Sequence, residues 1–464
     1  MGKNFVLSLI SVMIFGGVVE ARPRDHLYRQ FIEQQNIKLG FVAPVQSTVV
    51  ENTFDQVLNP ADPKDTRTYK QRYFIDSSLA SGVNPPVFLA LCGEWTCSSS
   101  ELNWLRSYAA IYHAHLISLE HRYYGASQPF TTLTTDNLKY LRTEYAVSDI
   151  ARFQKYAMTT LGMTGKWVVA GGSYSANLAA YYRLKYPDLV VGALASSAPV
   201  QALANFEDYD LHVSKVIAGA CGKAVQQTVQ KLDMAVLDPS ELAKVKALFG
   251  ASEIKDTGDF MMVAADMVAT AVQYGFQNEF CDQMLNATDL LQGYGDAGQT
   301  MFANVGETPL ADSYQVAESE TDFTGNRAWT YQSCTEFGYW QTAYHDPSLA
   351  MRSAAVNEDY YNQVCKRVFG FTKPVDTSFI NKTFYGPLLA PDVRNIMFTN
   401  GSFDPWSELS ITNERHNGQS PFLTLFTILA GSHTSDLHMA SDNDSASLKQ
   451  ERAEFARVLA TWLQ

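Results

Sequence analysis

Strand-like apolar runs recur at both ends of this chain, and each is bounded by polar or glycine-containing turns. They lie at residues 87–91, 115–119, 167–170, 394–400 and 422–429. Bounded runs of this length are typical of buried strands. The run at 167–170 leads through a glycine turn into a helical stretch at 177–184. Strands followed by helices in this way predict an α/β fold.

The strand pattern stops between Pro199 and about Asn381, and helical periodicity replaces it. Helices are predicted at residues 215–237, 240–249 and 260–274. Because this block interrupts the chain between two groups of strands, we expect an insertion that caps the strand ends and shapes a site there. The predicted division is a leader at 1–21, a first core part at 22–199, the helical cap at 200–381 and a second core part at 382–464.

The turn after the strand at 167–170 places Ser173 between a strand and a helix. Such a turn lifts a serine hydroxyl clear of the sheet and directs the next backbone N–H to the same spot. The common pattern is G-x-S-x-G, and this chain has Gly171 in the first place and Ser175 in the last. Both residues are small, so the turn should close. A glycine-rich turn without chemistry is the alternative, and the turn alone does not decide.

A serine nucleophile needs a base that is itself oriented by a carboxylate. Asp404 follows the strand at 394–400, and His433 follows the strand at 422–429. The order Ser173, Asp404, His433 is the nucleophile, acid, base order of α/β-hydrolases. An aspartate that binds turn amides, or a histidine in solvent, would explain each residue singly but not all three together. We therefore expect a catalytic triad.

The chain has nine histidines, and His438 is the nearest rival to His433. It lies past the strand-end loop, where a surface or core role is the better interpretation. The histidines and cysteines form neither an H-E-x-x-H nor a C-x-x-C motif, so we expect no metal and no cofactor.

The length and composition of the chain indicate its domain organisation, and its charge restricts the partners it can bind. A chain of 464 residues suggests two domains, and 46% hydrophobic with 18% charged residues argues against disorder. The net charge of -13 disfavours nucleic acid as a partner and is compatible with an acidic compartment.

The N-terminus predicts export. An apolar run at residues 5–19 follows Lys3, and Val19-Glu20-Ala21 supplies the small residues that a signal peptidase reads. The run is shorter than a membrane span. We expect cleavage after Ala21 and a secreted or lysosomal/vacuolar protein, or a periplasmic or extracellular one if the source is bacterial.

Six cysteines without a C-x-x-C motif favour disulfides in an exported chain. The close spacing of Cys92 and Cys97 suggests one pair. The glycosylation sequons at Asn286, Asn381 and Asn443 would be used only in a eukaryotic secretory pathway.

Several separated blocks of this chain carry a family resemblance. The blocks are residues 69–74, 120–125, 171–175, 185–187, 195–199, 331–338 and 404–406. From about Thr66 onward the chain resembles the serine peptidase family of prolylcarboxypeptidase, dipeptidyl peptidase II and thymus-specific serine protease, with the thymus-specific branch nearest. The resemblance implies an α/β-hydrolase core with an inserted, mostly helical cap. It places the triad on the same three residues, Ser173, Asp404 and His433.

The resemblance also implies two further disulfides, Cys221 with Cys281 and Cys334 with Cys365. It suggests that Asn177 and Tyr339 line the S1 pocket, where members that cleave after proline carry methionine. An unpaired buried amide facing a proline ring would cost about 1 to 3 kcal/mol. We therefore expect no strong preference for proline.

Three further segments are predicted around the triad. Trp406 offers either a flat pocket wall or a core side chain under Asp404. Gly93 and Glu94 follow the strand at 87–91, so Gly93 is a candidate for the second oxyanion-hole N–H beside that of Tyr174, and Glu94 for substrate binding. The polar block at 120–125 is better explained as structural support for the turn.

These observations predict an exported serine peptidase that hydrolyses short peptides, an exopeptidase of carboxypeptidase or dipeptidyl peptidase type. The alternatives are an esterase or lipase of the same fold and a catalytically silent hydrolase that binds a ligand. Which end of the peptide is held, and whether the chain forms a homodimer, stay open.

Overall fold

An eight-stranded sheet organises the chain, which this computed structural model describes at residues 48–304, 325–416 and 420–464. The predicted signal peptide lies outside the described residues. The strand order is β1-β2-β4-β3-β5-β6-β9-β10; β2 runs antiparallel to both neighbours and every other pair is parallel. The strands are β1 Val50–Val57, β2 Thr68–Asp76, β3 Val87–Leu91, β4 His115–Leu119, β5 Trp167–Gly172, β6 Gly192–Ser196, β9 Ile396–Gly401 and β10 Thr424–Ile428. The α/β-hydrolase core expected from the sequence is confirmed.

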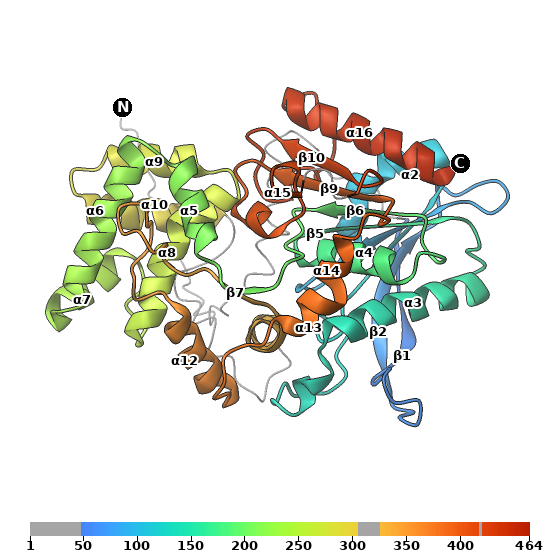
Figure 1. Cartoon of the computed structure of the whole chain (residues 1–464), viewed down its shortest axis with the longest axis horizontal. Helices are drawn as coiled ribbons and strands as arrows, with labels where there is room; N and C mark the ends of the chain where they lie inside the picture. Colours follow the sequence, from blue (N-terminus) through green and yellow to red (C-terminus); the bar gives the residue numbers. More distant parts are fainter. Residues whose placement is uncertain (1–47, 305–324, 417–419) are drawn as a thin grey trace, which may run out of the picture.

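The central strands β3, β5 and β6 are buried along their whole length because helices cover both faces of the sheet. Along β3, Leu89 and Leu91 point into one hydrophobic core, and Phe88 and Ala90 point into the other. The first core is closed by α3 (Thr143–Thr160) and α4 (Tyr174–Lys185), and the second by α2 (Arg106–Tyr112) and α16 (Ala446–Leu463). The sheet is thus the middle layer of three, with α16 along one side (Figure 1).

Between β6 and β9 the chain leaves the sheet. Helices α5 to α10 gather in a bundle set apart from the sheet (Figure 1). Their bounds, with those of the shorter helices, are α5 Glu207–Val216, α6 Ala220–Ala235, α7 Pro239–Leu248, α8 Thr257–Gln273, α9 Gln277–Leu285, α10 Leu290–Asn304, α11 Asn326–Gln332, α12 Glu358–Phe369, α13 Ser378–Ile380, α14 Gly386–Leu388 and α15 Asn413–His416. Short 3-10 and π-helical turns lie at η1 Ser99–Leu105, η2 Asn137–Tyr140, η3 Ser333–Phe337, η4 Asn381–Tyr385 and η5 Pro405–Leu409. None of the described helices is both long and apolar enough to span a membrane.

One sequence-based prediction for this segment is wrong in detail. The single helix predicted at 215–237 is two helices, α5 and α6, because the chain turns at Gly219, whose φ of 84° favours glycine. The segment is also not purely helical. Two short parallel strands, β7 (Leu203–Asn205) and β8 (Gly338–Trp340), pair within it.

Three disulfides staple the structure, with the pairings expected from the sequence. Cys92 pairs with Cys97 within the loop after β3. The other two lie in the segment between β6 and β9: Cys221–Cys281 joins α6 to α9, and Cys334–Cys365 joins η3 to α12.

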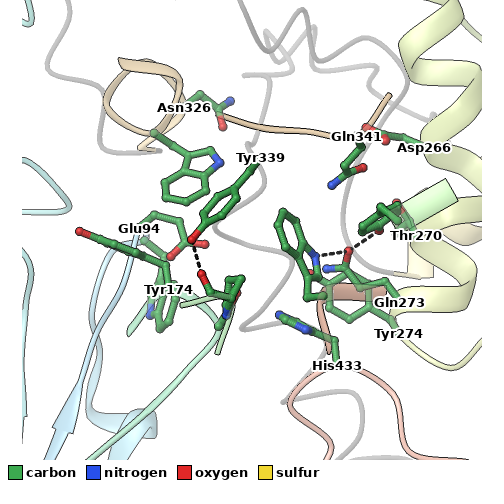
Figure 2. Close-up of a pocket in the computed structure, with 16 residues that line it drawn as sticks. Glu94, Tyr174, Asp266, Thr270, Gln273, Tyr274, Asn326, Tyr339, Gln341 and His433 are labelled. Carbon is green, nitrogen blue, oxygen red and sulfur yellow. Dashed lines mark hydrogen bonds between the residues drawn. The ribbon is translucent and has the colours of Figure 1, made fainter. Parts of the chain in front are cut away.

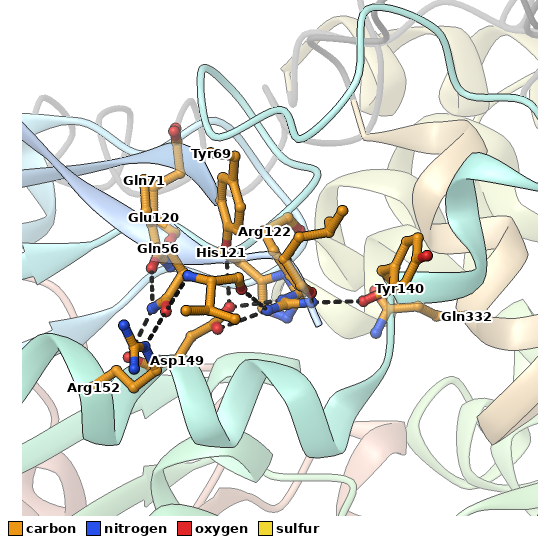
Figure 3. Close-up of polar contacts among 12 residues, drawn as sticks. Gln56, Tyr69, Gln71, Glu120, His121, Arg122, Tyr140, Asp149, Arg152 and Gln332 are labelled. Atoms are coloured by element: carbon orange, nitrogen blue, oxygen red, sulfur yellow. Dashed lines mark hydrogen bonds and ion pairs between the residues drawn. The ribbon is translucent and has the colours of Figure 1, made fainter. Parts of the chain in front are cut away.

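A buried ion pair between Arg122 and Asp149 lies beside β1 and β2 and connects several segments of the core (Figure 3). Arg122 is fully buried and donates two hydrogen bonds of 2.7 Å to Asp149. Its remaining N–H groups reach the carbonyl oxygens of Val57, Leu58 and Tyr140. All five guanidinium donors therefore have acceptors, as a buried arginine requires. This supports the structural role predicted for residues 120–125.

We predict that Arg122→Met strongly destabilises the fold. The substitution leaves the Asp149 carboxylate buried without its partner, which costs about 3 to 5 kcal/mol. Denaturant unfolding of the purified protein measures the loss. The control is Lys244→Met, which removes an exposed partner of Glu241 and should leave the midpoint unchanged. Equal midpoints for both variants would contradict the role assigned to the pair.

Candidate active site

The turn after β5 holds Ser173 in a strained backbone conformation, with φ 57° and ψ −130°. A Cβ on Gly171 would lie 2.4 Å from the carbonyl oxygen of Ser175, so only glycine fits there. The Ser175 hydroxyl accepts from the Gly172 N–H at 3.0 Å and donates to the Gly172 carbonyl at 2.8 Å. Ser175 thus closes the turn at the place where the common pattern has glycine.

Asp404 and His433 form a buried pair beyond the ends of β9 and β10. His433 Nδ1 lies 2.9 Å from Asp404 Oδ2. The other carboxylate oxygen, Oδ1, accepts from the Trp406 N–H at 3.0 Å, which fixes its orientation. Because a carboxylate accepts hydrogen bonds, Nδ1 carries the proton and Nε2 is left free to act as a base. Ser173 and His433 line the same cavity.

The carboxyl end of α8 holds the histidine loop from the side of the helical bundle. The backbone carbonyl of Gln273 accepts from the His433 N–H at 2.8 Å. Its side-chain Oε1 accepts from Trp406 Nε1 at 3.0 Å and from the Tyr209 hydroxyl at 2.7 Å (Figure 2). The ring of Tyr274 stands edge-on to that of His433. One helix end therefore contacts both His433 and the loop that carries Asp404 and Trp406.

A buried network fixes the side chain of Tyr174, the residue after Ser173. Its hydroxyl accepts from Gln332 Nε2 at 2.8 Å and lies 3.1 Å from His121 Nε2. His121 Nδ1 faces the Arg122 carbonyl at 2.7 Å, so Nδ1 carries the proton and the tyrosine donates to Nε2. Burial lowers the pKa of His121 to about 3, which keeps the ring neutral. The network links α11 of the helical segment to the turn.

A cavity lies at the carboxyl ends of the strands, between the core and α8 (Figure 2). Seven aromatic rings dominate its lining: Trp95, Tyr174, Tyr209, Tyr274, Trp329, Tyr339 and Trp406. The remaining lining residues are Ser173, Pro199, His433, Glu94, Asp266, Thr270, Gln273, Asn326 and Gln341. Among these described residues two are acidic and none is lysine or arginine.

The disulfide-closed loop after β3 brings Gly93 and Glu94 to this site. A Cβ on Gly93 would lie 2.5 Å from the Trp95 ring, so the close packing requires glycine. Glu94 lines the cavity, and its Oε2 is buried without a hydrogen-bond partner. Burial raises the pKa of Glu94 to about 7, although its own backbone N–H and His433 oppose the shift.

Of the residues expected at the S1 pocket, two line the cavity and one does not. Tyr339 and Trp406 line the cavity, with ring centroids 5.5 Å apart. Asn177 is fully buried and is not among the lining residues. Its Nδ2 donates to the Pro199 carbonyl at 3.0 Å and to the Tyr339 hydroxyl at 3.2 Å, whereas its Oδ1 has no partner. Asn177 therefore acts on the cavity through Tyr339.

Two groups that compete for triad roles are engaged elsewhere. His438 Nε2 lies 3.1 Å from Asp444, in agreement with the core role predicted for it. The carboxylate of Asp436 accepts from the hydroxyls of Ser196 on β6 and Thr399 on β9, so it stabilises the sheet. No group of three or more His, Cys, Asp or Glu side chains within the described ranges could hold a metal ion.

Sequence reasoning missed the contributions of α8 and α11 to the cavity. Asp266, Thr270, Gln273 and Tyr274 recur on one face of α8 with helical spacing, and Trp329 comes from α11. The spacing on α8 was visible in the sequence, but it gave no sign that this face looks toward the strand ends.

A buried carboxylate links η3 to the core. Glu336 Oε2 accepts from the backbone N–H of Thr143 at 2.9 Å and from its hydroxyl at 2.8 Å, at the first residue of α3. A carboxylate there satisfies a free helix amide and is favoured by the helix dipole. Burial nevertheless raises the pKa of Glu336 to about 7, although Thr143 and Arg142 oppose the shift.

Comparison with known proteins gives one matching family. Residues 56–455 match the family model described as Serine carboxypeptidase S28. The chain is 33% identical to the probable serine protease EDA2 of Arabidopsis thaliana, over 80% of this chain and 78% of that protein. It is 28% identical to the thymus-specific serine protease of Mus musculus, over 96% and 93% of the two chains. It is 26% identical to the lysosomal Pro-X carboxypeptidase of Bos taurus, over 86% and 84%.

We predict that Gln273→Leu lowers kcat about tenfold with little change in KM, because the Trp406 indole N–H and the Tyr209 hydroxyl lose their acceptor and the loop that carries Asp404 and Trp406 shifts. The rate at which a fluorophosphonate labels Ser173 should fall by the same factor, since labelling needs the base but no peptide. Thr270→Val, one turn earlier on α8, is the matched control and should label at the wild-type rate. Equal labelling rates for the wild type and Gln273→Leu would show that the side-chain hydrogen bonds of Gln273 do not position His433 and Asp404.

We predict that Glu336→Gln makes the fold less sensitive to alkaline pH. A raised pKa means that the folded state binds the proton more tightly. Stability is therefore greatest below the unfolded pKa and falls as the pH rises to about 7. The substitution removes this loss, worth at most about 3 kcal/mol. Unfolding free energies of wild type and variant at pH 4.5 and pH 8 give the comparison, and parallel losses in both proteins would refute it.

Proposed function

The chain belongs to the serine carboxypeptidase S28 family and is a serine-type peptidase, and we propose that Ser173, Asp404 and His433 are its catalytic triad. One observation carries the proposal. The three residues follow the carboxyl ends of β5, β9 and β10, His433 is paired with Asp404, and its ring shares a cavity with Ser173. Ligands of open α/β sheets bind at this edge.

In this mechanism Ser173 Oγ attacks the peptide carbonyl while His433 Nε2 takes its proton. Asp404 holds the imidazole in the tautomer that leaves Nε2 free and stabilises the imidazolium that forms. His433 then protonates the leaving amine, and water hydrolyses the acyl-enzyme by the reverse transfer.

The backbone N–H groups of Tyr174 and Gly93 form the proposed oxyanion hole. Tyr174 is the first residue of α4, where helix amides have no intrahelical acceptor. The N-terminus of the helix also favours negative charge. Gly93 precedes the lining residues Glu94 and Trp95, on a loop that Trp95 packing and the disulfide hold.

We assign the segment at 200–381 as the cap of this site. It supplies Tyr209, Asp266, Gln273 and Tyr339 to the cavity wall. A substrate has to fit between this wall and the strand ends, which favours short peptides and exopeptidase action. Tyr339 and Trp406 are the proposed S1 walls. The Tyr339 hydroxyl accepts a hydrogen bond from Asn177, and the family resemblance suggests methionine at both positions in members that cleave after proline. We therefore expect no strong preference for proline at P1.

We propose that the enzyme is exported, to the cell exterior or to a lysosome or vacuole. Three disulfides suit an oxidising compartment. The sequons Asn286 and Asn443 are exposed and available for glycosylation. Asn381 is not, because its amide forms two hydrogen bonds with the backbone of Ala202. A homodimer stays a prediction.

We predict that Ser173→Ala lowers peptide hydrolysis by several orders of magnitude while the thermal unfolding midpoint stays near that of wild type. A fluorophosphonate should label the wild type at Ser173 and fail to label the variant, as mass spectrometry of the labelled peptide would show. Ser175→Ala is the matched control in the same turn and should still label. Labelling at Ser175, or turnover near wild type in Ser173→Ala, would remove Ser173 from the mechanism. Hydrolysis of acyl esters but of no peptide would favour an esterase.

A further inference from the structure

The carboxylate of Glu94 has no partner for Oε2, which is buried in the wall of the cavity. The cause is the rigidity of its loop. Cys92 and Cys97 are bonded, Gly93 is pressed against the Trp95 ring, and Glu120 accepts from the Cys97 N–H at 3.0 Å. Glu94 therefore cannot turn away to solvent without breaking this packing. A buried oxygen without a donor is costly unless a ligand supplies the donor.

The charges around the cavity indicate which ligand group that is. Of the described lining residues, Glu94 and Asp266 are acidic, His433 is the one titratable base, and none is lysine or arginine. Glu94 lies on the core wall and Asp266 on α8 opposite (Figure 2). A peptide carboxylate would find no cation here and would meet like charge. An ammonium group would find complementary charge on both walls.

We propose that Glu94 binds the free α-ammonium group at the N-terminus of the peptide, so that the enzyme releases short fragments from the N-terminal end. This inference rests on the proposed function of Ser173. Because Glu94 and Ser173 line one cavity, the N-terminus lies within a few residues of the scissile bond. The ammonium donates to the unpaired oxygen and neutralises a carboxylate whose pKa burial raises. The peptide's C-terminus then extends away from Glu94.

Four versions of one alanine tetrapeptide test this proposal: both ends free, N-acetylated, C-amidated and both ends blocked. We expect acetylation to lower kcat/KM by about 100-fold or more, since the acetyl amide cannot supply the charged donor. Amidation should change kcat/KM by less than about threefold, because no described group of the cavity pairs with a carboxylate. An acetylated peptide with lysine at P1 tests whether a side-chain cation can replace the α-ammonium group, and it should be cleaved as poorly as acetylated alanine.

Variants then assign the effect to Glu94. Glu94→Gln should abolish the preference for the free amine while fluorophosphonate still labels Ser173, which also shows that the variant is folded. Glu94→Asp keeps the charge and should keep part of the preference. Asp266→Asn removes the complementary charge of the opposite wall and should weaken the preference in part. Glu241→Gln, which removes an exposed carboxylate outside the cavity, is the matched control and should leave the preference in place.

The outcomes separate the two proposals. If Ser173 labels but free and acetylated peptides are cleaved equally, or amidation is the change that stops cleavage, the amine site is overturned and the peptidase stands. Rapid cleavage of the acetylated lysine peptide would also overturn it, in favour of a side-chain pocket. If Ser173 neither labels nor supports cleavage of any peptide, both proposals fall.

Discussion

The strained turn at Ser173 is the constraint to which the rest of the site is fitted. A φ of 57° and a ψ of −130° are an unfavourable backbone conformation for serine. Contacts with neighbouring residues must therefore hold Ser173 in it. Gly171 lets strand and helix nearly touch, Ser175 bonds back to Gly172, and the Ser173 N–H donates to the Ser196 carbonyl at 2.9 Å. The result is a serine that lines the cavity beside the free amides at the start of α4. The position of β6, and hence the middle of the sheet, is part of this support.

The segment between β6 and β9 acts on the same site from the opposite side. Gln273 bonds the His433 backbone and the Trp406 ring, while Asp266 and Thr270 on the same helix line the cavity. The cavity wall and the position of His433, the proposed base, therefore depend on one helix. A second link, from Gln332 to Tyr174, reaches the oxyanion side. The insertion is thus bonded to both halves of the proposed catalytic apparatus, which explains why its helices need two disulfides to hold their geometry.

Features that depend on local sequence could be predicted, and features that depend on distant contacts could not. The strand ends that carry Ser173, Asp404 and His433 were visible because apolar runs and glycine turns mark them locally. The break at Gly219 was missed because one glycine within a helical pattern is often tolerated. The orientation of Tyr339 depends on its φ of 61° and on the positive φ of Gly338, which packs against Ala204. The partners of Asn177 come from residues 22 and 162 positions away, and no local pattern reveals them.

Two carboxylates near the loop after β3 show how the fold distinguishes structure from function. Glu120 accepts from Nε and Nη2 of Arg72, from the backbone N–H groups of Cys97 and Ala126, and from the Ser127 hydroxyl. Every direction around it is filled, so it can only stabilise the loop. Glu94, in the same loop, lines the cavity, and its buried Oε2 has no donor. Because the first carboxylate holds the loop, the second stays buried and available. The donor that its Oε2 lacks is what the proposed ammonium contact would supply.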